Sequence, residues 1–252
     1  MIDVHCHILP GIDDGAQDLT ESLALLSLAQ ADGIRKMVAT PHINPGYFDT
    51  TPARIRSALD ALRSAAQQAG ITVELAAAAE VRLCAEIPLW TEQAQLPFLG
   101  RWQGSDVLLL EFPHSHIPPG ADKLVQWLLK RNIRCMIAHP ERNRDVQADP
   151  RVLQPFLRAE CLFQLTASSL LGDLGARHQG CAEQLVRQGL YQVMASDSHN
   201  VQRRPPKLTP ARLRLQQLVG DEVAMQLVSV NPERLTTAYH FAPSVVSDAC
   251  IS

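Results

Sequence analysis

Residues 1–7 of the chain, MIDVHCH, form a short and largely apolar run that ends in two histidines separated by one residue. Such a run is typical of a buried β-strand. Alternate residues of a strand lie on the same face, so His5 and His7 can bind one metal ion together. Asp3 has the same parity, and we expect its carboxylate to orient one of the two imidazoles.

Similar apolar runs recur along the chain and alternate with segments of helical spacing. The further runs lie at 36–40, 72–79, 106–111, 134–138, 162–166 and 191–196. The helical segments lie at 20–31, 52–69, 121–131, 150–159, 176–188 and 210–228. The runs mostly lack period-two alternation, which is typical of parallel strands covered by helices on both faces. The order therefore predicts an α/β fold with seven strands in a parallel sheet or barrel.

Length and composition allow one domain or two and exclude several classes of protein. The chain has 252 residues, of which 46% are hydrophobic, and its net charge is −3 without a run of Lys or Arg. A nucleic-acid-binding protein usually carries a basic patch, so we expect no nucleic-acid partner. No apolar window approaches the length of a membrane span and the N-terminus has no signal peptide, so we expect a cytoplasmic protein without membrane insertion. We expect one domain over residues 1–240, a C-terminal tail at 241–252, and free thiols at all six cysteines.

Six of the seven predicted strands end in side chains that can bind a metal. These residues are His5, His7, His42, Glu80, Glu111, His139, Asp197 and His199. The carboxyl ends of parallel strands converge at one end of a sheet or barrel, where α/β enzymes have their sites. Glu80 and Glu111 each follow at least three apolar residues, and a carboxylate there is costly to bury without a cation. The pattern predicts a multinuclear metal site.

The charge of this site indicates the class of substrate. Four carboxylates contribute −4 and three divalent ions would contribute +6; the carboxylates are Asp14, Glu80, Glu111 and Asp197. Arg142 and Arg204 flank two of the clusters and make the site more positive, so a phosphate dianion fits it. A bound metal lowers the pKa of water to about 7 and so provides hydroxide at neutral pH. These residues predict a metal-dependent phosphoester hydrolase.

A second possible nucleophile is Cys181, because residues 181–187 have the C-x5-R spacing of cysteine-based tyrosine phosphatases. In those enzymes the loop cradles phosphate with backbone N–H groups and needs glycine. Here the segment contains no glycine, Glu183 would repel phosphate, and the apolar residues have helical spacing. We interpret the match as a coincidence.

Taken together, the motifs resemble those of the PHP (polymerase and histidinol phosphatase) superfamily. The matching stretches are DVHCH at 3–7, LPGIDDG at 9–15, TPH at 40–42, AE at 79–80, EFP at 111–113, AHPER at 138–142 and SDSHN at 196–200. Within the superfamily the chain looks most like the CpsB/CapC-like tyrosine-protein phosphatases of bacterial capsule and exopolysaccharide loci. The loop at 9–15 is the most specific part, because Asp14 stands where many PHP proteins have a histidine.

The resemblance implies a fold and a set of metal ligands. The fold would be a distorted (β/α)7 TIM-like barrel, the PHP fold, with up to three divalent metals, often Mn²⁺, with Fe or Zn as alternatives. The implied ligands are His5, His7, Glu80 and Asp197 for one ion, Glu80, Glu111 and His139 for a second, and Asp14, His42 and His199 for a third. Arg142 and Arg204 match arginines near the phosphate. Arg203 and Asp13 stand next to two of these residues and remain alternatives to them.

The resemblance also implies an activity. The chain would be a metal-dependent protein-tyrosine phosphatase in which a metal-bound hydroxide attacks phosphorus. Its partner would be the phosphotyrosine-containing C-terminal tail of a bacterial tyrosine autokinase that controls capsular or extracellular polysaccharide synthesis. A tyrosine phenolate, with a pKa near 10, is a fair leaving group. His199 or a metal-bound water could supply its proton.

Two neighbouring segments and two other functions stay open. Residues 44–48, NPGYF, could line an aromatic pocket or form a surface turn. Residues 114–116, HSH, could reach the rim of the site, but we expect them to be a solvated loop. One alternative function is a PHP-type phosphatase of a small metabolite such as histidinol phosphate. The other is a non-catalytic, metal-bound regulator of polysaccharide assembly.

Overall fold

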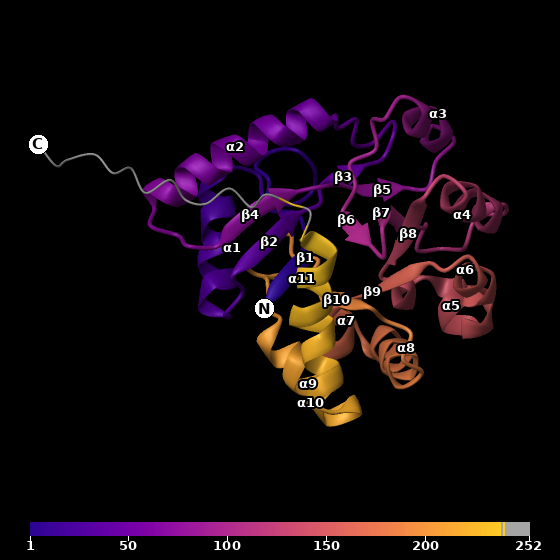
Figure 1. Cartoon of the computed structure of the whole chain (residues 1–252). Coiled ribbons are helices and arrows are strands. Elements are labelled where there is room, and N and C mark those ends of the chain that lie inside the picture. Colours follow the sequence, from indigo (N-terminus) through magenta and orange to yellow (C-terminus); the bar gives the residue numbers. More distant parts are fainter. Residues whose placement is uncertain (238, 240–252) are drawn as a thin grey trace, which may run out of the picture.

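The barrel consists of two parallel sheets that continue one another (Figure 1). The structure is a computed structural model, and it describes residues 1–237 and residue 239. One sheet contains β1 (Ile2–Cys6), β2 (Lys36–Ala39) and β4 (Glu74–Ala77). The other has the order β10 (Val193–Ala195), β9 (Leu162–Thr166), β8 (Ile133–Ala138), β7 (Ser105–Glu111), β5 (Glu80–Arg82) and β3 (His42–Ile43). A short strand, β6 (Gly100–Trp102), pairs with β7 in antiparallel orientation.

Backbone hydrogen bonds at the strand ends join the two sheets. Only two residues separate β2 from β3, and one of them is Pro41, which has no N–H to donate to a ladder. The Glu80 N–H nevertheless donates to the Pro41 carbonyl over 3.1 Å. On the other side, Asp197 N–H donates to the His5 carbonyl and His7 N–H to the Ser198 carbonyl, each over 2.8 Å. Seven strand positions therefore follow one another around the barrel in chain order, and the predicted α/β barrel is confirmed.

The predicted helices form on the outside of the barrel, and the structure adds several short ones. The helices are α1 (Leu19–Ala31), α2 (Pro52–Gln68), α3 (Ile87–Glu92), α4 (Ala121–Leu129), η1 (Pro140–Arg142), α5 (Arg144–Ala148), η2 (Pro150–Leu153), α6 (Gln154–Arg158), α7 (Ala167–Leu171) and α8 (Ala176–Arg187). Thr51 caps α2 by accepting the Arg54 N–H, and Pro52 begins the helix. Two predicted helices are divided instead. The one predicted over 150–159 becomes η2 and α6, and the one predicted over 210–228 becomes α9 (Thr209–Val219), α10 (Asp221–Met225) and η3 (Gln226–Val230). Gly220 lies at the break with a φ of 89°.

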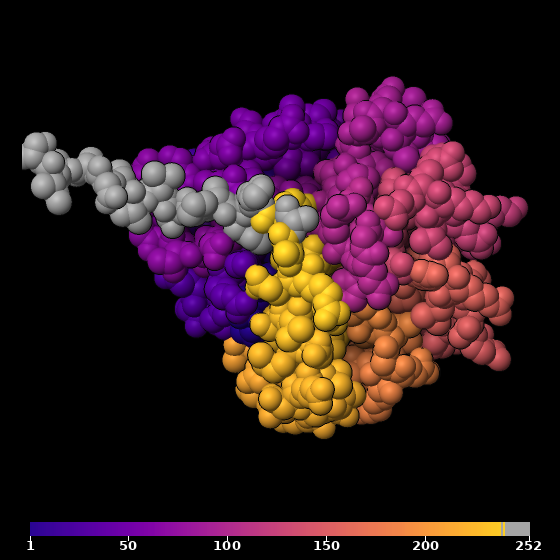
Figure 2. Space-filling view, viewed as in Figure 1, coloured from indigo at the N-terminus to yellow at the C-terminus, as the bar shows by residue number. Residues whose placement is uncertain are grey.

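Helix α11 (Asn231–Thr236) closes one end of the barrel. Figure 1 looks onto this end, and Figure 2 shows the C-terminal helices (yellow) packed between the N-terminal and middle parts of the chain. Leu235 belongs to the cluster of buried side chains inside the barrel, together with Ile2, Val4 and Trp102. A Cβ at Gly100 would lie 2.1 Å from the Leu235 carbonyl oxygen, so this close approach requires glycine. The opposite end, where β1 and β10 finish, is left for polar side chains.

Three of the sequence predictions concern the chain as a whole. The boundary predicted at residue 240 and the tail predicted at 241–252 lie outside the described residues, and the single domain stays a prediction. The five cysteines that the structure describes are free, as predicted. Within residues 1–237 and 239, no helix combines the length and the apolar character needed to cross a membrane.

Candidate metal centre

The metal-competent side chains at the strand ends converge at the end of the barrel opposite α11. Four overlapping groups have donor atoms within 4.8 Å of one another: His7, Asp14, His42 and His199; His5, His7 and Glu80; Glu111, His114 and His139; and His42, Glu80 and Glu111. Asp197, which belongs to none of these groups, lies 3.6 Å from His5 and 3.5 Å from His7 through its Oδ1. All nine predicted metal ligands thus belong to one site. Their assignment to individual ions stays a prediction.

Glu80 lies at the centre of this site and is almost completely buried. Its Oε2 lies 3.3 Å from His5 Nε2, 3.4 Å from His7 Nε2 and 3.0 Å from His42 Nδ1, yet it makes no hydrogen bond. Its Oε1 lies 2.8 Å from His139 Nε2. Burial raises the pKa of Glu80, but the attraction of His5 and His42 outweighs it and holds the pKa well below the usual value. A buried oxygen without a hydrogen bond among imidazole nitrogens fits a cation shared by these groups.

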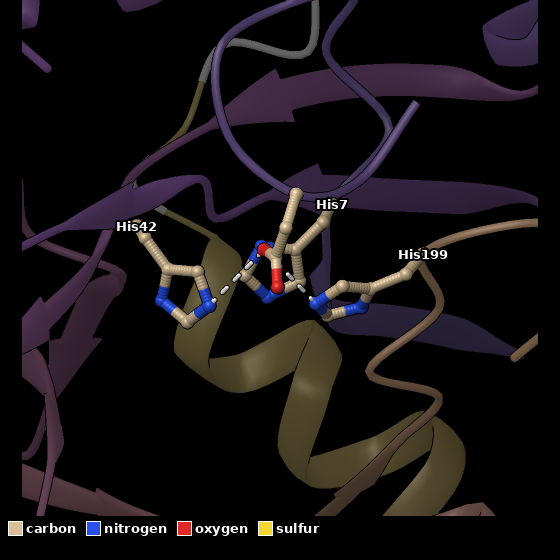
Figure 3. A group of neighbouring side chains, drawn as sticks. His7, His42 and His199 are labelled. Carbon is tan, nitrogen blue, oxygen red and sulfur yellow. Dashed lines mark ion pairs between the residues drawn. The ribbon is translucent and has the colours of Figure 1, made fainter. Parts of the chain in front are cut away.

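His42 and His199, two of the donors predicted for the third ion, lie beside His7, and the three imidazoles point toward one another. Figure 3 shows His7, His42 and His199 in this arrangement, with dashed lines for the ion pairs. Asp14 Oδ1 lies 3.5 Å from the Nε2 atoms of both His42 and His199. The Asp14 side chain is 53% exposed, so it lies at the mouth of the site. The predicted donors of this ion, Asp14, His42 and His199, lie within 4.8 Å of His7, and imidazoles together with a carboxylate are a suitable ligand set for Mn, Fe or Zn.

Asp13 and Asp14 have different surroundings, and this difference distinguishes between the two residues that the sequence offered as a metal ligand. The Asp13 Oδ2 lies 2.7 Å from His7 Nδ1 and accepts the His42 backbone N–H over 2.9 Å. Gly15 allows the loop to fold back onto His7, because a Cβ there would lie 2.0 Å from the His7 carbonyl oxygen. Asp13 therefore orients His7, and Asp14 remains the neighbour that faces the other donors.

Gln164 on β9 orients His5, and sequence reasoning missed it. Its Oε1 lies 2.9 Å from His5 Nδ1 and accepts the His139 backbone N–H over 3.2 Å. An amide oxygen at this position favours the tautomer with a proton on Nδ1, which leaves the His5 Nε2 free to bind a metal. The only signal in the sequence was a single amide in the middle of the apolar run at 162–166.

The expectation that Asp3 orients one of the histidine rings is wrong. Its carboxylate accepts the backbone N–H of His5 over 3.3 Å and the backbone N–H and hydroxyl of Ser196 over 3.0 and 2.5 Å. The pairing register of β1 shifts between Asp3 and Cys6, so the alternation that would place Asp3 with the histidine side chains does not hold. Asp3 instead ties β1 to the end of β10.

Arg142 and Arg204 lie side by side at Asp197, and Arg203 does not. The Asp197 Oδ2 accepts a hydrogen bond from Arg142 Nη1 over 2.6 Å and from Arg204 Nη2 over 2.5 Å. Burial raises the pKa of Asp197, but Arg204 and His5 outweigh it and hold this pKa well below its usual value. The Arg203 side chain is exposed, and its backbone N–H donates to Asn200. Of the two neighbouring arginines, Arg204 is therefore the one that faces the site.

Two strand-end residues have an unusual backbone. His139 has a φ of 31° and Asp197 a φ of 53°, a region that residues other than glycine rarely adopt. Glu141 supports the turn after His139, because its buried carboxylate accepts the Thr166 N–H and the Tyr191 hydroxyl. Strained residues at the ends of β8 and β10 are typical of functional sites, where surrounding structure holds them in place.

His114 also reaches the site, although the sequence led us to expect a solvated loop at 114–116. Its Nε2 lies 3.7 Å from Glu111 Oε1, and its ring centroid lies 5.4 Å from that of His139. Glu111 in turn pairs with Arg82 over 2.9 Å. Burial and the negative charge of Glu80 raise the pKa of Glu111, whereas the pKa of Glu80 itself is lowered. His116 is also exposed, but unlike His114 it belongs to none of the donor groups.

Cys181 lies on α8, and the segment that it begins does not form a phosphate-binding loop. The segment from Cys181 to Arg187 is helical, and Arg187 pairs with Glu183 over 3.0 Å. Burial raises the pKa of the Cys181 thiol to about 12, which disfavours the reactive thiolate. The interpretation of the C-x5-R match as a coincidence is confirmed.

Comparison with known proteins supports the same chemistry. A family described as "Capsular polysaccharide synthesis, CpsB/CapC" matches residues 1–237. The tyrosine-protein phosphatase YwqE of Bacillus subtilis is 34% identical over 227 residues, which are 90% of this chain and 88% of YwqE. The tyrosine-protein phosphatase CpsB of Streptococcus pneumoniae is 26% identical, over 93% of this chain and 98% of CpsB.

Solved structures agree with the fold. One from a study of YwqE and CpsB, described there as unique metal-dependent tyrosine phosphatases, has a TM-score of 0.87 and 33% identity, over 95% of this chain and 96% of that one. An organophosphorus hydrolase from Deinococcus radiodurans has a TM-score of 0.55 and 16% identity, over 93% of this chain and 92% of that one. The second similarity concerns the fold alone.

Proposed function

Because this chain belongs to the CpsB/CapC family of capsular polysaccharide synthesis, we propose that it is a metal-dependent protein-tyrosine phosphatase, a hydrolase of phosphoric monoesters. The observation that carries this proposal is the buried Glu80 Oε2, which lies among three imidazole nitrogens without a hydrogen bond. The donors come from residues 5 to 199, so we assign them to one catalytic domain over residues 1–240.

We assign the donors to three divalent ions, with Mn²⁺ as the first choice. His5, His7, Glu80 and Asp197 would hold one ion, Glu80, Glu111 and His139 a second, and Asp14, His42 and His199 a third. When bound, such ions acidify water and neutralise phosphoryl oxygens. Mixed imidazole and carboxylate ligands also suit Fe and Zn, so availability contributes to the choice.

The remaining steps belong to residues of the chain. Arg142 and Arg204 present guanidinium groups beside Asp197, where they can hydrogen-bond the phosphoryl oxygens of a substrate. His199 lies 3.5 Å from Asp14, and burial and the charge of His7 lower its pKa to about 4. The proton for the leaving phenolate would come from His199 or from a metal-bound water, the two alternatives that the sequence left open.

The substrate we propose is phosphotyrosine in the C-terminal tail of a bacterial tyrosine kinase that controls capsular or extracellular polysaccharide synthesis. The relatives are named tyrosine-protein phosphatases, and the family is described by capsular polysaccharide synthesis. We also propose a cytoplasmic location, because a kinase tail that is phosphorylated from ATP is a cytoplasmic substrate.

Removal of metal tests the proposed function directly. We expect the chelator-treated protein to lose hydrolysis of p-nitrophenyl phosphate and of phosphotyrosyl peptides, and we expect added Mn²⁺ to restore both activities. The reason is that the carboxylates and imidazoles around Glu80 need cations before the site can bind an anion. The measurement is phosphate release before and after dialysis against chelator. Full activity in protein shown to be free of metal would contradict the proposal, and a large kcat/KM preference for histidinol phosphate would favour the metabolite phosphatase.

Beside the metal centre lies a cavity that fits the aromatic part of such a substrate. The cavity has a volume of about 230 Å³, and its walls include Ile43, Pro45, Phe48, Thr51, Trp90 and Pro97. The Phe48 ring stacks on His42, with centroids 5.5 Å apart and an interplanar angle of 14°. A tight turn holds Phe48, since its backbone exchanges hydrogen bonds with Asn44 over 2.8 and 3.1 Å. Residues 44–48 thus form a surface turn that also lines a pocket next to the site.

We expect Phe48→Ala to raise the KM for a phosphotyrosyl peptide up to about tenfold with little change in kcat. An aromatic contact is worth about 0.5–1.5 kcal/mol, and about 1.4 kcal/mol corresponds to a factor of ten. Tyr47 is the matched control, because its side chain is 82% exposed and Tyr47→Ala should leave KM unchanged. Equal KM values for the wild type and Phe48→Ala would show that peptide binding does not use this cavity.

A further inference from the structure

The loop after β7 carries His114, a residue that the three predicted ligand sets do not include. Its side chain is 48% exposed, and its Nε2 lies 3.7 Å from Glu111 Oε1. This distance is too long for a hydrogen bond. It is close to the separation of about 3.4 Å that two donors have when each lies about 2.1 Å from a shared ion in tetrahedral geometry. The donor atoms of Glu111, His114 and His139 all lie within 4.8 Å of one another.

Hydrogen bonds hold the backbone of this loop although the His114 side chain is half exposed. The Pro113 carbonyl accepts a hydrogen bond from Asn143 Nδ2 over 2.7 Å, and the His114 carbonyl accepts the Arg144 N–H over 2.9 Å. Phe112, directly before them, is buried and its ring lies 5.1 Å from that of Phe156. The loop is therefore fixed to the turn after His139, and His114 is positioned beside Glu111.

The second predicted ion has the fewest nitrogen donors without His114. Its other donors are Glu80, Glu111 and His139, of which Glu80 is shared with neighbouring groups. Arg82, which pairs with Glu111 over 2.9 Å, leaves the other oxygen of that carboxylate toward His114. An added imidazole would give two nitrogen and two carboxylate donors. Such a set of ligands suits transition metals better than it suits Mg²⁺.

We infer that His114 is an additional ligand of the metal held by Glu111 and His139, which closes that site from the solvent side. This inference rests on the metal centre of the proposed function. It gives a role to a loop residue that would otherwise be an ordinary surface residue. With His114 as a ligand, the site would be selective for ions that bind imidazole.

Metal binding to His114→Ala tests this inference. The chelator-treated protein is titrated with Mn²⁺ by calorimetry and loaded separately with Co²⁺, whose visible absorption reports coordination. We expect His114→Ala to bind one ion at least about tenfold more weakly than the wild type and to change the Co²⁺ spectrum. Tenfold is the smallest loss of metal affinity that is typical when even a residue that only supports a ligand is removed. His116→Ala is the matched control, because its ring contacts Ser115 and it belongs to none of the donor groups.

The possible results separate this inference from the proposed function. Wild-type metal affinities and an unchanged Co²⁺ spectrum in His114→Ala would overturn the role of His114 alone. A wild-type protein that binds no divalent metal would overturn the inference and the proposed function together. Thermal unfolding of the metal-free variants controls for folding, and equal midpoints with weaker metal binding in His114→Ala support a ligand.

Discussion

Replacing Glu80 by glutamine should reduce kcat/KM about a thousandfold and lower the metal content of the purified protein. Glutamine keeps the volume of the side chain but removes the charge that His5, His7 and His42 face at 3.0–3.4 Å. A metal ion contributes several kcal/mol of charge stabilisation, and about 4 kcal/mol corresponds to a factor of about a thousand. Because Glu80 touches donors of all three predicted ions, its loss should affect more than one of them.

The measurements are phosphate release from a phosphotyrosyl peptide and elemental analysis of the protein. Glu92→Gln is the control for the chemical exchange, because Glu92 is exposed at the end of α3. Thermal unfolding in the presence of chelator shows whether Glu80→Gln still folds. If the folded variant retained more than a tenth of the wild-type kcat/KM, Glu80 would not be the shared ligand.

The strand ends could be predicted because two simple signals coincide there. An apolar run of four to seven residues reports a buried strand, and a histidine or carboxylate directly after it is costly unless it has a function. Glu80 and Glu111 illustrate this, since both are buried at the ends of apolar runs and both lie in the observed donor groups. The β–α alternation then predicted the barrel, because parallel strands bring such ends together.

Other residues could not be assigned, because their roles depend on contacts between distant strands. Gln164 orients His5 from 159 positions away, and an amide in a strand carries no sign of its partner. Asp3 was misassigned because the register shift in β1 is a property of pairing with β2, which local alternation does not contain. His114 lies in a loop without periodicity, so only the hydrogen bonds to Asn143 and Arg144 reveal its fixed position.

The neighbouring arginines provide the sharpest test of how the site binds phosphate. We expect Arg204→Ala to reduce kcat/KM for a phosphotyrosyl peptide by about 10²–10³-fold. This is the effect of removing one hydrogen-bond donor that stabilises the negative charge developing in the transition state. The Arg204 Nη2 lies 2.5 Å from Asp197 Oδ2 beside the Arg142 guanidinium, so both groups face the same anion site. Competitive inhibition by inorganic phosphate should also weaken, but by a smaller factor, because the ground-state anion uses the same donor without the charge that develops in the transition state.

Arg203→Ala is the control, because Arg203 is the adjacent residue, has the same charge and presents an exposed side chain. Its kcat/KM should stay within about twofold of the wild type, in line with the small effect of an exposed charge. Arg204→Lys should recover only part of the activity, because an ammonium group lacks the planar pair of donors that phosphate accepts. A larger loss in Arg203→Ala than in Arg204→Ala would place the phosphate on the other arginine and reverse the assignment drawn from Asp197.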